Sequence, residues 1–463
     1  MLKKVVIALE ILLVIILLWV GYAFFKFKTN PKNETFVETA SNIFPFGDFG
    51  SSPDLKLGSG GGAVGDTTPS PDSTLDGNTT DDPSLNTPSV IPRLRQITTV
   101  PTAGSIIVPR EKEIIKDGKK TKITEYFIRY TDRATGHVSE TKTDSLSVEK
   151  ISNTTIPKVY EAYYTFGGDG FLARLLDDDG ETIKTYFVSL VKNTGTSTDP
   201  ANILSPKESS ISFLPNNLRE VSLSPDRLSL LSLSYGGSGG VIEAGSVTGK
   251  NKKTVYNGEL REWLIEWVDA GRAILTTKPS GYVVGYSYFL NMVSGGFDKI
   301  TGGILGLTIH AAPNTQFILV GEGGNTQNLS VYSTKDRSLR VTGLKTLPEK
   351  CTFAKKEKNT AYCLVPFILP EGVYPDSWYK GDITFSDTLW KINLENGETK
   401  LVANFRYPYN QEIDGVNPEV ASNDAYITFI NKKDLTLWGY TIEEQVAATT
   451  TKSTASSTAV LPR

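Results

Sequence analysis

Apolar and polar residues alternate along most of the chain, in short runs that are joined by polar turns. The run from Glu220 to Ser234, EVSLSPDRLSLLSLS, shows the unit: two alternating runs on either side of a tight turn. Period-two alternation is typical of β-strands, and Asp, Asn, Gly and Pro suit tight turns. The same pattern begins again at Val159, Leu264, Gly306, Lys350 and Pro418. The sequence therefore predicts a series of antiparallel hairpins.

A second pair of alternating runs follows each hairpin, so the repeated unit has four strands. Four strands in a period near 40–50 residues are typical of a β-propeller blade. The segments from Leu94 and from Thr124 supply one more unit. The prediction is an all-β fold, a propeller of about seven four-stranded blades, with six or eight still possible. Because the last copy, LTLWGYTIEE, is short, we expect strands near Leu94 to complete it and close the ring.

The two ends of the chain have a different composition. Residues 5–25 are apolar apart from Glu10 and are long enough to span a ~30 Å bilayer core as a helix. We expect a signal-anchor helix over 1–28, with its N-terminus in the cytoplasm and the chain after it outside the cell membrane. Residues 29–92, rich in Gly, Ser, Thr, Pro and Asp, predict a disordered linker. The propeller is expected over 93–444 and a disordered tail over 445–463.

Charge and the few reactive side chains restrict the chemistry. A formal net charge of −3 with mixed signs gives no basic footprint, which argues against nucleic acid as a partner. The two histidines, His137 and His310, lack metal-ligand spacing, so we expect no metal site and no cofactor. Cys351 and Cys363 lie on the two arms of one predicted hairpin. They are a candidate disulfide outside the membrane, or else two buried thiols.

Several motifs resemble a known group of proteins. The turn Ser224-Pro225-Asp226 resembles those of WD40-like and TolB-type propellers of bacterial envelopes. The phrases YTDRATGHVSE, ISNTTIP and YPDSWYKGDITFSDTLWKIN resemble uncharacterised membrane-anchored propellers of Parcubacteria-type bacteria. The resemblance implies a propeller fold and an envelope location, and it implies no activity.

Two long connections are the candidate binding site. In a propeller, the loops between the second and third strands and those between blades emerge on one face. The predicted loops over 367–386 and 404–417 would meet there, on adjacent blades. Aromatic side chains with an arginine are typical of binding hot spots. The same loops could instead plug the channel, and both readings stay open. The candidate residues are Tyr374, Asp376, Trp378, Tyr379, Arg406, Tyr407 and Tyr409.

Three functions remain possible from the sequence. The first is a membrane-tethered, extracytoplasmic binding or scaffold module for a protein or glycan partner at the cell surface. The second is an envelope hydrolase or lyase acting on glycan or peptide. Its only clustered carboxylates would be Asp376, Asp382 and Asp387, whose spacing is not specific, and no catalytic residue is assigned. The third is a structural subunit of an envelope or pilus-like assembly, suggested by Glu10 and the linker.

Overall fold

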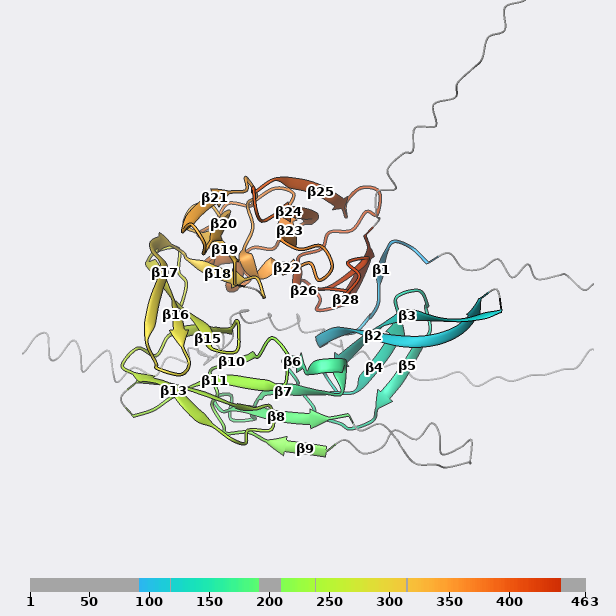
Figure 1. The fold of residues 1–463 in the computed structure, drawn as a ribbon, viewed down its shortest axis with the longest axis horizontal. Helices are drawn as coiled ribbons and strands as arrows, with labels where there is room; N and C mark the ends of the chain where they lie inside the picture. Colours follow the sequence, from blue (N-terminus) through green and yellow to red (C-terminus); the bar gives the residue numbers. More distant parts are fainter. Residues whose placement is uncertain (1–90, 117, 191–209, 238, 314, 443–463) are drawn as a thin grey trace, which may run out of the picture. The chain divides into compact units, whose positions relative to one another are not determined.

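The computed structural model describes residues 91–116, 118–190, 210–237, 239–313 and 315–442. They form seven antiparallel sheets of four strands each, arranged in a ring (Figure 1). The predicted seven-bladed propeller is therefore confirmed. The anchor predicted over residues 1–28, the linker and the tail lie outside the described residues. No helix in the described ranges is long and apolar enough to cross a membrane.

The first three sheets, named blades 1 to 3, follow the chain in order. Blade 1 contains β2 (Thr102–Lys116), β3 (Lys119–Asp132), β4 (Val138–Lys142) and β5 (Val148–Ser152). Blade 2 contains β6 (Glu161–Tyr164), β7 (Gly170–Leu176), β8 (Ile183–Ser189) and β9 (Ser210–Phe213), with the short 3-10 helix η1 (Phe166–Gly168) between its first two strands. Blade 3 contains β10 (Glu220–Leu223), β11 (Ser229–Tyr235), β12 (Gly240–Ser246) and β13 (Lys253–Gly258).

Blades 4 to 6 repeat this order. Blade 4 contains β14 (Trp263–Trp267), β15 (Arg272–Thr277), β16 (Val284–Asn291) and β17 (Phe297–Leu305). Blade 5 contains β18 (Thr308–Ala311), β19 (Phe317–Glu322), β20 (Asn328–Ser333) and β21 (Ser338–Val341). Blade 6 contains β22 (Cys351–Phe353), β23 (Thr360–Pro366), β24 (Asp387–Asn393) and β25 (Thr399–Asn404), and it is preceded by η2 (Pro348–Lys350). The helix α2 (Asp376–Tyr379) lies between β23 and β24.

Blade 7 closes the ring with strands from both ends of the described chain. It contains β26 (Gly415–Val420), β27 (Tyr426–Asn431), β28 (Leu437–Thr441) and, on its outer edge, β1 (Leu94–Gln96). Leu94 lies opposite Tyr440 and is buried. The expected closure by strands near Leu94 is confirmed. The segment from Leu94 was also placed in the first blade, and that placement is wrong because blade 1 begins only at Thr102.

Apolar side chains fill the interfaces between neighbouring blades. Blades 1 and 2 share a buried cluster that includes Ile106 and Phe171, and blades 6 and 7 share one that includes Leu364 and Phe429. The last interface, between blades 7 and 1, also contains polar links. The Arg95 guanidinium on β1 donates to the backbone carbonyls of Lys142 (2.7 Å) and Ser145 in blade 1. Each small sheet is thus covered on both faces, which a single blade cannot achieve.

Cys351 and Cys363 lie directly opposite each other on β22 and β23 and form a disulfide. Both side chains are buried in the cluster shared by blades 5 and 6. The bond links the innermost strand of blade 6 to its neighbour. That strand follows η2, whose residues contribute to the site described below.

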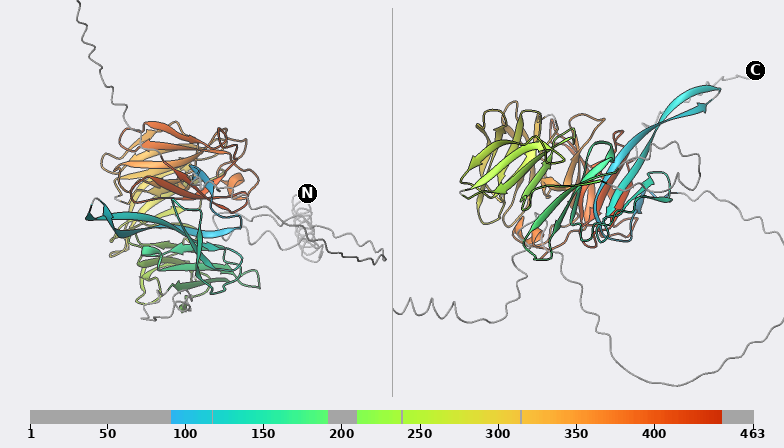
Figure 2. Two further views of the ribbon diagram at one scale, coloured as in Figure 1. Left: turned by 90° about the vertical axis from the view of Figure 1, so that its right-hand side faces the viewer. Right: turned by 90° about the horizontal axis from the view of Figure 1, so that it is seen from below.

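The ring has two distinct faces. The strap face carries the loops between second and third strands and those that join blades, including residues 367–386, which are named the strap. The hairpin face carries the remaining turns. There β2 and β3 continue past the ring as a two-stranded hairpin, drawn in blue in Figure 2. The main chain of Thr441 donates to the Arg93 carbonyl (2.8 Å), so both ends of the described chain lie together beside the blade 7 turn on the hairpin face.

We predict that deleting Arg93–Gln96 from the full chain will lower the free energy of unfolding by about 4 kcal/mol. The deletion exposes the face of β28 that Leu94 covers and removes a ladder of backbone hydrogen bonds. Chemical denaturation of the intact chain measures the loss. An equally long deletion over residues 86–89 is the control. Equal stability of the two deletion variants would contradict closure by β1.

Candidate functional site

The strap runs from blade 6 across the ring to blades 4 and 5. Tyr374 and Gly324 exchange two backbone hydrogen bonds, of 2.7 and 2.8 Å, which attaches the strap to blade 5. The Asp376 carboxylate accepts from the Ser280 hydroxyl (3.0 Å) and the Gly281 main chain (2.5 Å), which attaches it to blade 4. The strap therefore bridges three blades on one face.

Glycines make room for this crossing. A Cβ atom on Gly323 would lie 2.2 Å from the Tyr374 carbonyl oxygen, and one on Gly281 would lie 2.4 Å from it. No other residue allows the strap backbone to approach so closely. The segments Gly321-Glu322-Gly323-Gly324 and Ser280-Gly281 are thus shaped to receive it.

A buried cluster of charges fastens the middle of the strap. The Lys350 ammonium lies 2.6 Å from the Asp414 carboxylate and 2.9 Å from that of Asp387, and all three side chains are fully buried. Asp414 also accepts from the Trp378 indole N–H (2.9 Å) and from the Phe385 main chain (3.0 Å). Lysine and aspartate are buried only when they are paired. This cluster, named the lock, thus connects η2, the strap and the blade 6–7 connection.

A second lysine joins the lock from blade 7. Lys432 donates to the Trp378 carbonyl (2.6 Å), and its ammonium lies 4.7 Å from the centre of the Trp378 ring. Burial lowers the pKa of Lys432 to about 8, against the attraction of Asp414. Burial raises the pKa of Asp387 to about 7, while burial of Asp414 is outweighed by Lys350, which holds the pKa of Asp414 below its usual value. The surroundings thus favour the ionised form of Asp414 more than that of Asp387.

The predicted site residues divide into buried and exposed groups. Tyr374 and Trp378 are 0% exposed, and the Trp378 ring stacks on Phe385. These two predicted binding residues therefore lie inside the fold, where they hold the strap in place. Tyr409 is half-buried against Tyr440.

Other members of the predicted set do lie near the surface. Tyr407 is 67% exposed, and the Arg406 guanidinium pairs with Glu412 (3.3 Å) and faces the Phe367 ring at 6.0 Å. Phe367 and Ile368, at the start of the strap, are also exposed but were not predicted. Phe367, Ile368, Arg406 and Tyr407 are named the strap-face patch. The exposure of Phe367 and Ile368 could not be predicted from the sequence, since alternation gives no signal inside a loop.

A further group of polar side chains lies on or beside the innermost strands and is named the axial cluster. It consists of Glu220, Ser222, Glu266, His310, Glu349 and Tyr379. The innermost strands lack a partner on the side toward the axis (Figure 1). Two of their free main-chain N–H groups donate instead to a side chain of the neighbouring blade. The Trp267 N–H donates to the Ser222 hydroxyl (2.9 Å), and the Ala311 N–H donates to the Glu266 carboxylate (3.2 Å). Glu266 also bonds to Nδ1 of His310 at 2.8 Å. His310 therefore has a structural partner, and the attraction of Glu266 outweighs burial and raises its pKa.

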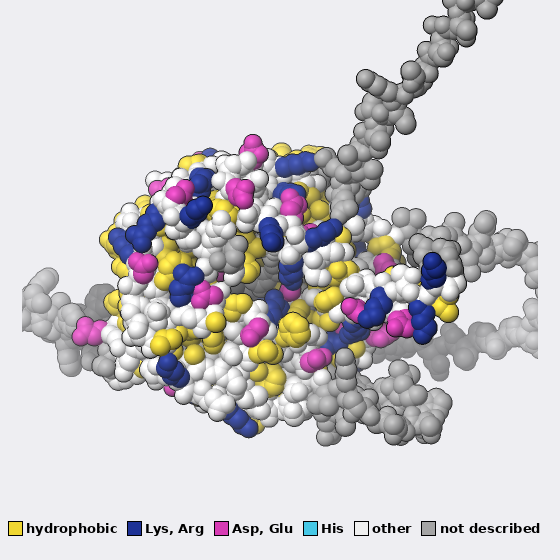
Figure 3. Space-filling view, viewed as in Figure 1, with side chains coloured by type: hydrophobic (Ala, Val, Ile, Leu, Met, Phe, Trp, Pro, Cys, Tyr) yellow, Lys and Arg dark blue, Asp and Glu magenta, His cyan; other side chains and the backbone are white. Residues whose placement is uncertain are grey.

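The strap contributes to the axial cluster through Tyr379. Its hydroxyl donates to Glu349 of η2, and burial raises the pKa values of both groups. Burial also raises the pKa of Glu220 on β10 to about 8, against the attraction of Arg174. A carboxyl with this pKa can exchange its proton near neutral pH. Figure 3 shows the ring hollowed at its centre, with charges of both signs at the border.

Three carboxylates considered for catalysis do not form a common site. Asp376 caps the loop of blade 4, Asp387 belongs to the buried lock, and Asp382 is exposed on the strap. Within the described ranges, no group of three or more His, Cys, Asp and Glu residues is placed to hold a metal ion. His137 has its own local partner, the Thr155 hydroxyl at 3.1 Å.

Comparison with known proteins finds a likeness only among solved structures. No protein-family model and no curated protein matches the chain. An oligogalacturonate lyase in complex with manganese matches 74% of this chain and 99% of its own, with 8% identity and a TM-score of 0.47. TolB from Acinetobacter baumannii matches 73% of this chain and 80% of its own, with 9% identity and a TM-score of 0.37. Such distant likeness assigns no activity, and the fold rests on the strand pairing itself.

We predict that Lys350→Met will lower the free energy of unfolding by about 3–5 kcal/mol, because it leaves two buried carboxyls without their cation. Trypsin should then cut faster after Lys380, an exposed residue of the strap. Lys391→Met, at a surface lysine of the same blade paired with Glu357, is the matched control and should cost less than about 1 kcal/mol. Equal stability of the two variants would show that the lock does not hold the strap.

We predict that folding stability decreases as pH rises from about 5 to about 8. A glutamate in the unfolded chain has a pKa of about 4.3, whereas the pKa of Glu220 in the folded protein is raised to about 8. The folded state therefore binds more protons across this window, and stability is lost as they dissociate. Glu220→Gln should make the decline shallower in urea titrations across the pH range. Parallel pH profiles for the variant and the wild type would show that Glu220 does not cause the decline in stability.

Proposed function

We propose that the protein is a binding module that holds a partner on the strap face at the cell surface. The observation that carries the proposal is the strap-face patch: Phe367, Ile368 and Tyr407 are exposed beside Arg406, on loops fixed by the lock. Exposed aromatic and aliphatic residues beside an arginine have the composition of an interface hot spot. A rigid base favours binding because little conformational entropy is lost when the partner docks.

A protein fits the patch better than a glycan. A sugar ring needs an aromatic face with hydrogen-bonding groups around it. Here Ile368 is 70% exposed beside Phe367, and the guanidinium of Arg406 is already shared between Glu412 and the Phe367 ring. Apolar side chains of a protein would cover this surface more completely. The glycan partner remains the alternative within the same function.

The first experiment identifies the partner by photo-crosslinking. A photoreactive phenylalanine analogue replaces Tyr407 in the full chain, and a second version carries it at Phe166, which is 70% exposed on the hairpin face. The proposal expects one defined protein crosslinked from position 407 and not from position 166. A crosslink from both positions, or only from 166, would contradict it.

We predict that Phe367→Ser with Tyr407→Ser will weaken binding of that partner at least about tenfold, since two exposed anchors are lost. The matched control replaces Phe166 and Val293, two apolar residues of similar exposure on the hairpin face. Binding of the full chain is measured by surface plasmon resonance, with thermal unfolding to verify the fold. Equal affinity of both double variants would place the interface elsewhere.

A further inference from the structure

The hairpin of β2 and β3 extends well beyond its own sheet. Its strands pair without a break from Ile106↔Arg129 to Lys116↔Lys119, whereas the next strand, β4, ends at Phe127↔Lys142. The eight residue pairs past that point span about 27 Å. Among the described residues, no third strand pairs with this outer part. A two-stranded ribbon of this kind gains little stability from its own contacts in water.

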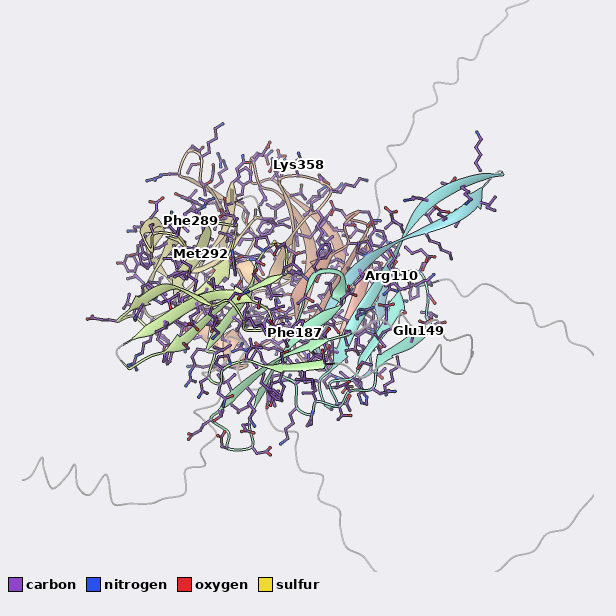
Figure 4. The ribbon with its side chains drawn as sticks, turned by 60° about the horizontal axis from the view of Figure 1, so that its bottom comes forward. Arg110, Glu149, Phe187, Phe289, Met292 and Lys358 are labelled. Carbon is purple, nitrogen blue, oxygen red and sulfur yellow. A yellow bond between two sulfur atoms is a disulfide. The ribbon has the colours of Figure 1, made fainter. Side chains whose placement is uncertain are left out.

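The base of the hairpin is held firmly. Arg110, labelled in Figure 4, lies at this base. Its guanidinium pairs with Glu140 (2.6 Å) and lies over the Phe127 ring at 4.1 Å. Glu125 pairs with Lys142 (2.9 Å) on β4, and the Tyr126 hydroxyl lies 3.2 Å from that of Ser422 in blade 7. Contacts to blades 1 and 7 therefore fix the direction in which the outer part projects.

The tip combines exposed isoleucines with lysines. Ile115 is 77% exposed, and Ile123 is 36% exposed on the opposite side of the ribbon. Residues 112–123 contain five lysines against Glu113 and Asp117, a net charge of +3 in a chain whose net charge is −3. Lys112, Lys120 and Lys122 contact glutamates nearer the base, in exposed pairs that contribute little. Positive charge is therefore concentrated toward the turn, where the exposed isoleucine lies.

The hairpin projects from the face on which the described chain begins and ends. Ser422, which contacts the hairpin base, lies in the turn that leads to Tyr426. Tyr426 pairs with Thr441, and the Thr441 main chain bonds to Arg93. Residues before Arg93 include the apolar run over 5–25, which the sequence predicts to enter a membrane. The chain therefore leads from that run to the face that carries the hairpin.

We propose that the hairpin tip binds the surface of an anionic lipid bilayer. Ile115 and its neighbours enter the boundary between headgroups and acyl chains, and the lysines contact lipid phosphates. This combination of apolar and basic residues is what interfacial binding requires. Strand addition by a protein is less favourable, because lysines along an open edge oppose it. The rigid base then keeps the ring at a set distance from the bilayer.

The test measures the depth of the tip with a fluorescent label in the full chain. Ile115→Cys provides one reactive thiol, since Cys351 and Cys363 are disulfide-bonded. The matched control is Tyr407→Cys, which labels a position of similar exposure on the strap face. Both proteins are placed in nanodiscs of phosphatidylcholine, with or without phosphatidylglycerol and with a lipid-borne quencher. The proposal expects quenching at position 115 only, and only with phosphatidylglycerol.

A variant without the tip lysines shows whether the label at position 115 is quenched because the tip binds lipid or only because the ring lies near the bilayer. Lys119→Gln, Lys120→Gln and Lys122→Gln together should abolish the quenching at position 115 and leave the melting temperature unchanged, because these side chains are exposed. Equal quenching at positions 115 and 407 would overturn the proposal. So would quenching that persists in neutral lipid, or a label at 115 that is covered by a bound protein instead of lipid.

Discussion

Every described sheet of this protein has two apolar faces, and a single four-stranded sheet cannot bury either of them by itself. A four-stranded sheet can bury its faces only against neighbouring sheets, so the fold is stable only as a closed ring. The closing step falls on three residues, Leu94–Gln96, which complete blade 7 from the far end of the described chain. Arg95 extends the closure into blade 1 through backbone carbonyls. The seven interfaces thus depend on a short strand that contributes little apolar area of its own.

The lock shows how a second constraint shapes the strap face. A strap that bridges three blades must bury some of its own backbone groups and aromatic rings. The structure meets this need with Lys350 and Lys432 against Asp387 and Asp414, and with indole and main-chain donors to Asp414. Charges buried in this way are tolerated only when each has its partners. The strap is therefore a fixed part of the fold, and recognition is left to the side chains at its margins.

Much of this fold could be predicted because strand alternation is a local signal. Hairpins such as Glu220–Ser234 gave both the strand positions and the blade count. The pairing of Cys351 with Cys363 was predicted from their places on the two arms of one hairpin, with two buried thiols as the alternative. The face of the two long loops was also predictable, since it depends only on strand order.

The lock and the axial cluster were not predictable, because they depend on contacts between distant parts of the chain. Lys350 stands in a polar stretch and would ordinarily be solvated, yet its partner Asp414 is 64 residues away. Trp378 looked like a binding residue because aromatic composition cannot distinguish a plug from an exposed anchor. Glu266 follows the ordinary strand alternation, and only the packing of blades 4 and 5 places it at His310.

The closure of the ring also separates the two faces in function. Because β1 pairs with β28, both ends of the described chain leave on the hairpin face, and the strap face carries neither. The hairpin, fixed by Arg110 and Tyr126 on the opposite side, would set the ring's distance from a lipid surface. The two proposed surfaces use different residues and different loops, so either can fail without affecting the other.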